Sequence, residues 1–142
     1  MAYQIKKSSR ITEELELLGE DGSIEKTINV DINTDRIAGG YRKAEIDLLN
    51  AQRNVKKGES SEALENYGKA VIGLFRLIFG DENTNIMLDF FDGKYTDMLI
   101  QVMPFINDVV KPAISASVAA QKSRIANNYN YNRKQKRKLG LK

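Results

Sequence analysis

The chain has 142 residues, of which 42% are hydrophobic and 29% charged, as expected for one soluble globular domain around a single core. It contains no cysteine and no histidine, which excludes disulfides, thiolate metal sites and any catalytic group that depends on an imidazole. The apolar runs are short and the first ten residues are polar, so we expect neither a membrane span nor a secretory signal. The predicted location is the cytoplasm.

Charge divides the sequence into an acidic body and a basic end. Every Asp and Glu lies at or before Asp108, whereas residues 122–142 hold eight of the 22 Lys and Arg residues. Residues 1–121 consequently carry a net charge of −5. The last part of the chain is highly charged and poor in apolar residues, a composition typical of disorder. We therefore predict one domain over residues 1–126 and a flexible basic tail over residues 127–142.

Two segments with alternating apolar and polar residues predict a β-hairpin over about residues 11–32. Leu15 and Leu17 alternate with glutamates in the first segment, and the second, Ile24–Ile32, continues the alternation. Asp21-Gly22 between them is a strong signal for a two-residue turn. That turn would place Leu15 opposite Ile28.

Apolar residues at helical spacing predict about four helices after the hairpin. Their expected ranges are from the cap residues Asn33-Thr34-Asp35 to Gly58, from Ser60 or Ser61 to Gly80, Asp81–Asp92 before Gly93, and a long helix from about Thr96. Gly39-Gly40 weakens the first of them, so a start after this pair is the alternative. The predicted fold is mainly α (α+β): the hairpin packs on the helices, the last helix extends from the body, and the basic tail is disordered.

The long helix has one clear apolar face and two prolines. The face comprises Leu99, Val102, Ile106, Val109 and Ala113. Because a proline inside a helix removes a hydrogen bond and crowds the preceding turn, we expect a kink near Ile100–Pro104 and a break at Pro112.

Further apolar residues of this helix lie outside that face: Met98, Met103, Phe105 and Val110. Methionine suits adaptable helix-binding grooves. A helix that is apolar on more than one side needs a second partner surface, although packing in the core is the alternative. The predicted partner-binding residues are Tyr95, Met98, Leu99, Val102, Met103, Phe105, Ile106 and Val110.

The same region carries an ordered set of motifs. They are Phe79-Gly80-Asp81-Glu82-Asn83, Ile86-Met87-Leu88, Phe90-Phe91, Gly93-Lys94-Tyr95, Met98-Leu99, and Pro104-Phe105-Ile106 followed by Val109 and Pro112. As a set they resemble the tail assembly chaperones of long-tailed bacteriophages and prophages of Gram-positive bacteria. The resemblance is close over Phe79–Pro112 and looser back to about Leu15.

This resemblance implies a non-enzymatic protein of the host cytoplasm that binds the phage tape-measure protein before and during tail-tube assembly. It also implies weak self-association, with the tail-tube protein as a further candidate partner. The residues add support, since no phosphate-binding glycine loop, no GxSxG motif and no calcium-loop pattern occurs. No cofactor and no catalytic or metal site is predicted.

The basic tail supports an alternative function, a small nucleic-acid-binding or structural phage protein. Its cations follow two tyrosines, Tyr129 and Tyr131, whose rings could stack on bases. The cations are Arg133, Lys134, Lys136, Arg137 and Lys138. The acidic body argues against nucleic acid as the main partner, because dedicated binders usually present a basic folded face.

Overall fold

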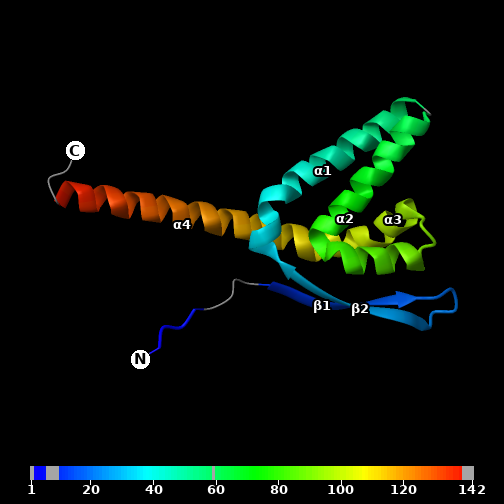
Figure 1. Cartoon of the computed structure of the whole chain (residues 1–142), viewed down its shortest axis with the longest axis horizontal. Helices are drawn as coiled ribbons and strands as arrows, with labels where there is room; N and C mark the ends of the chain where they lie inside the picture. Colours follow the sequence, from blue (N-terminus) through cyan, green and yellow to red (C-terminus); the bar gives the residue numbers. More distant parts are fainter. Residues whose placement is uncertain (1, 6–9, 59, 139–142) are drawn as a thin grey trace.

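The computed structural model describes residues 2–5, 10–58 and 60–138, excluding the side chains of 130–132 and 134–138. It is mainly helical with an N-terminal antiparallel hairpin, which confirms the predicted class (Figure 1). In chain order the elements are β1 (Arg10–Leu18), β2 (Ile24–Asn33), α1 (Thr34–Lys57), α2 (Ser61–Phe90), α3 (Tyr95–Phe105), the π-helical turn η1 (Ile106–Val110) and α4 (Lys111–Lys138).

The hairpin has the predicted register but a different turn. Leu15 pairs with Ile28 as expected, whereas the register shifts next to the turn, where Leu18 pairs with Ile24. Gly22 has φ +82° and donates its N–H to the Gly19 carbonyl at 2.9 Å. These features indicate a three-residue loop that ends in a left-handed glycine, in place of the predicted two-residue turn.

The apolar side of β2 packs on α2. Ile28, Val30 and Ile32 are each at most 2% exposed. The amide of Asn83, in the last turns of α2, donates to the Asn29 carbonyl of β2 at 3.1 Å. α2 also supplies Phe75, which is fully buried, to the same core. A hairpin of two strands is marginal alone, so this packing stabilises it.

Helix α1 begins at Thr34, before Gly39-Gly40, and not after this pair as the alternative prediction had it. Asn33 caps it by accepting a hydrogen bond from the Arg36 N–H at 3.3 Å, and the helix continues through Gly39 and Gly40. The glycines do not delay the start because the cap satisfies an exposed N–H and because Ile37 is buried in the core. α1 then runs antiparallel to α2, side by side with it (Figure 1).

Gly80 divides α2 where the sequence predicted a boundary. Its φ of +82° and ψ of +169° are non-helical, so the helix before it and the short one after it meet at a corner. The short helix ends at Phe90, two residues before the predicted Asp92. Gly93 follows with φ +77°, and its N–H donates to the Leu88 carbonyl at 2.8 Å.

The long helix does not break at Pro112 as predicted, and Pro104 lies inside α3. The chain remains helical from α3 into α4, and the Lys111 N–H donates to the Ile106 carbonyl five residues earlier, in a π turn. The turn lies just before Pro112, whose ring would otherwise crowd the carbonyl of Asp108. Pro112 is thus accommodated by widening the helix.

The π turn also changes which residues are buried. Leu99, Val102 and Ile106 are buried as predicted, but the buried face continues through Val110 and Ile114. The prediction that Val109 and Ala113 complete this face was therefore wrong by one position. A π turn contains one extra residue, and that residue rotates everything after it relative to the core.

The C-terminal segment differs from the predicted disordered tail. Helix α4 continues through Lys138 and projects from the body as a single rod (Figure 1). Residues 127–138 contain no proline or glycine, so nothing in the backbone stops a helix that has already started. Residues 139–142 lie outside the described residues.

Candidate binding groove

Most of the predicted partner-binding residues belong to the core. Met98, Leu99, Val102, Ile106 and Val110 are all buried, with Met98, Ile106 and Val110 at 0% exposed. The prediction that Met98 and Val110 lie outside the packed face was wrong. Except for Val102, whose side chain also lines the groove described below, these side chains serve the packing of the monomer.

The three remaining predicted residues are partly buried, and each contacts a different part of the protein. The Tyr95 hydroxyl donates to the Leu64 carbonyl of α2 at 3.4 Å. Phe105 stacks on Phe79 with ring centroids 6.2 Å apart, and Met103 packs against the core. The eight residues therefore do not form one exposed surface.

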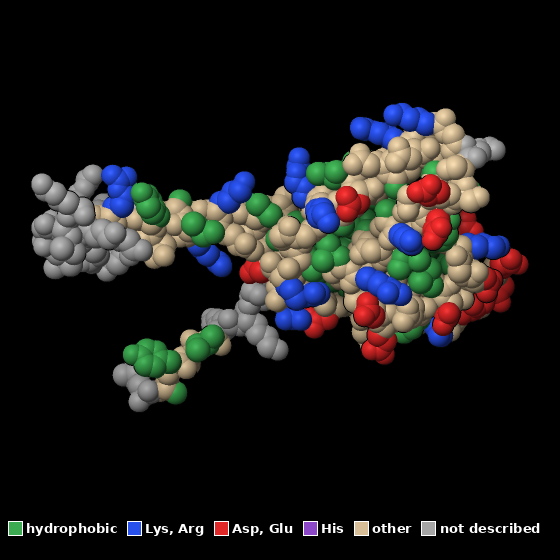
Figure 2. All heavy atoms as spheres, turned by 45° about the horizontal axis from the view of Figure 1, so that its top comes forward, with side chains coloured by type: hydrophobic (Ala, Val, Ile, Leu, Met, Phe, Trp, Pro, Cys, Tyr) green, Lys and Arg blue, Asp and Glu red, His purple; other side chains and the backbone are tan. Residues whose placement is uncertain are grey.

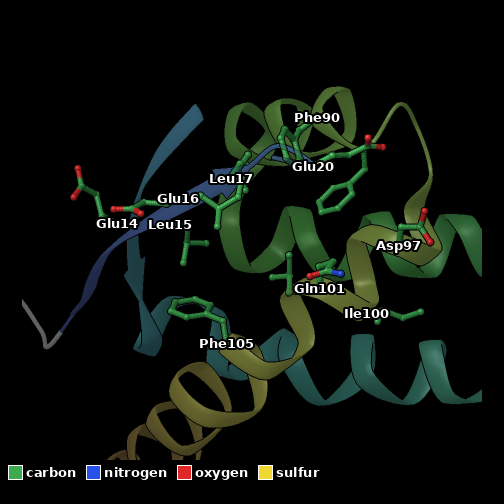
Figure 3. Close-up of a pocket in the computed structure, with 13 residues that line it drawn as sticks. Glu14, Leu15, Glu16, Leu17, Glu20, Phe90, Asp97, Ile100, Gln101 and Phe105 are labelled. Carbon is green, nitrogen blue, oxygen red and sulfur yellow. The ribbon is translucent and has the colours of Figure 1, made fainter. Parts of the chain in front are cut away.

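The structure instead forms a groove between β1 and α3 (Figure 3). Its volume is about 880 Å³, within the range of ligand sites. Only Val102 and Phe105 of the predicted set line it. Its remaining apolar lining consists of Leu15, Leu17, Leu18, Phe90, Phe91 and Ile100.

The apolar side chains come from three separate parts of the chain. Leu15 and Leu17 extend from β1 toward α3 (Figure 3). Phe90 and Phe91 also line the groove, and their rings pack edge to face with centroids 5.0 Å apart. Ile100 is 62% exposed, an unusual environment for an isoleucine in a packed helix. A partner's apolar side chains could cover this lining, because it is only partly buried by the monomer.

All charged residues that line the groove are acidic. They are Glu14, Glu16, Glu20 and Asp97. Glu14 and Glu16 extend from β1 on the side away from Leu15 and Leu17, so their carboxylates lie at the outer edge of the groove (Figure 3). Asp and Glu side chains also gather at this end of the molecule, opposite the projecting helix (Figure 2). The groove therefore favours an apolar partner that carries positive charge.

The sequence contained a partial signal for this groove. Ile100 is an apolar residue beside the predicted helix face, and Leu15 and Leu17 belong to a strand whose other face is acidic. Nothing local shows that this strand and this helix face each other. That relationship depends on how the hairpin packs on α2.

A second feature is the junction where α4 leaves the body. The Ser117 hydroxyl and the Gln121 amide both donate to the Asp35 carboxylate at the start of α1, the latter at 3.3 Å. These hydrogen bonds, the one from Ser117 first, lower the pKa of Asp35, and the positive charge of Arg124 acts in the same direction. Nearby in α1, burial raises the pKa of Tyr41 to about 12, with a further contribution from Glu45.

Beyond this junction, the side chains from Lys122 to Tyr129 are exposed. Ile125 and Tyr129 are 69% and 61% exposed, and the Arg133 guanidinium lies 5.8 Å from the centre of the Tyr129 ring. Of the predicted basic residues, only Arg133 has a described side chain. The side chains of Lys134, Lys136, Arg137 and Lys138 lie outside the described part.

The described residues show neither a metal site nor a membrane span. Within the described ranges, no three or more Asp, Glu, His or Cys side chains are grouped as metal ligands would be. None of the helices in those ranges combines the length and hydrophobicity needed to span a bilayer. Comparisons with protein-family models, with curated proteins and with solved structures found no match.

Proposed function

We propose that the protein is a non-enzymatic tail assembly chaperone that holds apolar helical segments of a phage tape-measure protein in the groove between β1 and α3. The observation that supports this most directly is the groove itself, which is apolar at its centre and open to solvent. It can bury side chains from one face of a helix, as helix-binding grooves do. The resemblance of Phe79–Pro112 to such chaperones supplies the identity of the client.

The proposed client surface differs from the one that the sequence suggested. Phe105 and Val102 remain part of it, whereas Met98 and Ile106 stabilise the fold beneath it. The chaperone would act in the host cytoplasm by covering apolar client segments until tail-tube subunits displace it. No bond is made or broken in this role, so it requires no cofactor.

Co-expression with the tape-measure protein tests the proposal. Wild type is compared with Ile100→Asp, which places a charge in the groove at a side chain that is already exposed. The matched control is Ile46→Asp, because Ile46 is 43% exposed in α1 and does not line the groove. We expect wild type and the control to keep the client soluble and to co-purify with it, and Ile100→Asp to fail. Equal binding by all three proteins, or by none, would contradict the proposal.

The alternative is a nucleic-acid-binding or structural phage protein that acts through α4. The observation that favours it is the exposed pair Arg133 and Tyr129 on the projecting helix. Binding of single-stranded DNA or RNA that weakens steeply with salt, and is lost in Arg133→Glu/Tyr129→Glu, would support this alternative. The same variant should leave client binding unchanged if the groove is the functional surface.

A further inference from the structure

We infer that the projecting half of α4 docks into the acidic-rimmed groove of a second copy of the chain, which links copies head to tail. The two surfaces are complementary in both hydrophobicity and charge. This interaction goes beyond the proposed function, since it holds whether or not the groove also takes a client.

The docking element is one face of α4. Ile125 and Tyr129 are four residues apart, so they lie together on one side of the helix. Lys122 and Arg133, three residues before Ile125 and four residues after Tyr129, fall on the same side. Both apolar side chains are exposed in the monomer, although each could bury substantial area. The face is therefore apolar at its centre and basic at both ends.

The receiving element has the opposite charge. Of the described residues, four acidic ones and no Lys or Arg line the groove, whereas residues 122–138 contain no acidic residue. Ile125 and Tyr129 can cover exposed Ile100 and the partly buried rings at the end of the groove. Lys122 and Arg133 would then lie near the carboxylates at the rim. Such an arrangement gives both apolar burial and electrostatic attraction.

The occupant must come from another molecule. Ser117 and Gln121 fix α4 to Asp35, and the helix leaves the body at the end opposite the groove (Figure 1). At about 1.5 Å per residue, residues 122–138 extend roughly 25 Å into solvent. A rod held in that direction cannot fold back onto its own groove. It can reach the groove of a neighbour.

This geometry predicts the type of assembly. One copy contributes its helix and the other its groove, so the interface joins two different surfaces. In such a pair, one copy still has a free groove and the other a free helix, so further copies can bind at either end. We expect open chains, whose length rises with protein concentration, or closed rings of a fixed number of copies. High salt should weaken the association, because part of the attraction is between exposed charges.

Two variants that each disable one surface provide the test. The helix variant is Ile125→Glu/Tyr129→Glu, and the groove variant is Ile100→Lys. The control is Ser123→Glu/Asn127→Glu, which adds the same charge at the same spacing on the opposite side of α4. All four residues on α4 and Ile100 are exposed, so the fold should persist, as circular dichroism would verify. Sedimentation velocity then measures the association of the full-length proteins.

We expect wild type and the control to associate, and each disabled variant alone to remain monomeric, with at least about tenfold weaker association. An equal mixture of the two disabled variants should form a heterodimer that grows no further, because only one intact helix and one intact groove remain. Wild type that stays monomeric at every concentration would overturn the inference. Association that survives in the groove variant would also overturn it and would indicate pairing between two α4 helices.

Discussion

The Ser117 hydroxyl donates a hydrogen bond to the Asp35 carboxylate, which joins α4 to the first turn of α1 across 82 positions of the sequence. Gln121 donates to the same oxygen one helical turn later. Together with Ile114, which is buried in the core, these contacts hold the first part of α4 against the body. The half-buried Asp35 carboxylate is therefore one of the groups that orient the basic helix relative to the groove.

Ser117→Ala should destabilise the protein in a pH-dependent way. The pKa of Asp35 is lowered from its ordinary value of 3.8, chiefly by the hydrogen bond from Ser117. Because the folded state holds the ionised carboxylate more strongly than the unfolded state does, this contribution is complete above about pH 3.8. It is lost as the pH falls further, through the folded-state pKa. We expect the variant to melt below wild type at neutral pH, with the difference shrinking in acid.

Ser115→Ala is the matched control, since Ser115 is exposed in the same helix and gains the same helix propensity on substitution. Thermal melts of the three proteins across the acid range measure the effect. A difference between wild type and Ser117→Ala that is the same at every pH would show that Asp35 is not the group involved.

Gly80→Ala should destabilise the fold by about 1–3 kcal/mol, because φ +82° with ψ +169° is a backbone conformation nearly restricted to glycine. Among the described residues, no atom beyond the adjoining backbone lies within 4 Å of a Cβ at this position, so the cost comes from the backbone conformation. Gly73→Ala is the control: it is equally open but helical, and should stabilise the protein by up to about 1 kcal/mol. Chemical denaturation would measure both, and opposite signs are expected.

Features set by local chemistry were predictable from the sequence. The boundary at Gly80 follows from a glycine between two apolar helical patterns. The pairing of Leu15 with Ile28 was predicted from a two-residue turn, and it holds because the register shift between Leu17 and Leu18 offsets the longer loop. The turn at Gly22 was mispredicted because Asp-Gly occurs both in two-residue turns and at the end of three-residue loops.

Features set by tertiary packing were not predictable. The spacing argument assumed a constant helical period, so it could not anticipate that a π turn shifts the buried face from Val109 to Val110. The groove depends on β1 facing α3, and no local pattern in either segment states that. Composition indicated disorder after residue 126, whereas α4 continues because it is already nucleated by its packed first turns.

Thr84→Val should stabilise the protein. Thr84 is fully buried, and its hydroxyl has no hydrogen-bond partner among the described residues. An unsatisfied buried polar group costs about 1–3 kcal/mol, and valine keeps nearly the same shape without that group. Thr84→Ser is the complementary variant, because it keeps the hydroxyl and loses the methyl group, and should lower stability by about 1 kcal/mol. If urea denaturation ranked valine below wild type, the hydroxyl would have to be satisfied in solution.

Met98 and Ile100 should separate stability from binding, although they lie two residues apart in α3. Met98 is 0% exposed, so Met98→Ala should cost about 2–5 kcal/mol of unfolding free energy. Ile100 is 62% exposed and lines the groove, so Ile100→Ala should change stability by no more than about 0.5 kcal/mol while weakening client binding. Denaturation curves and client pull-down with both purified variants test this division. A Met98→Ala protein with wild-type stability and no client binding would return Met98 to the binding surface and remove the basis for placing that surface in the groove.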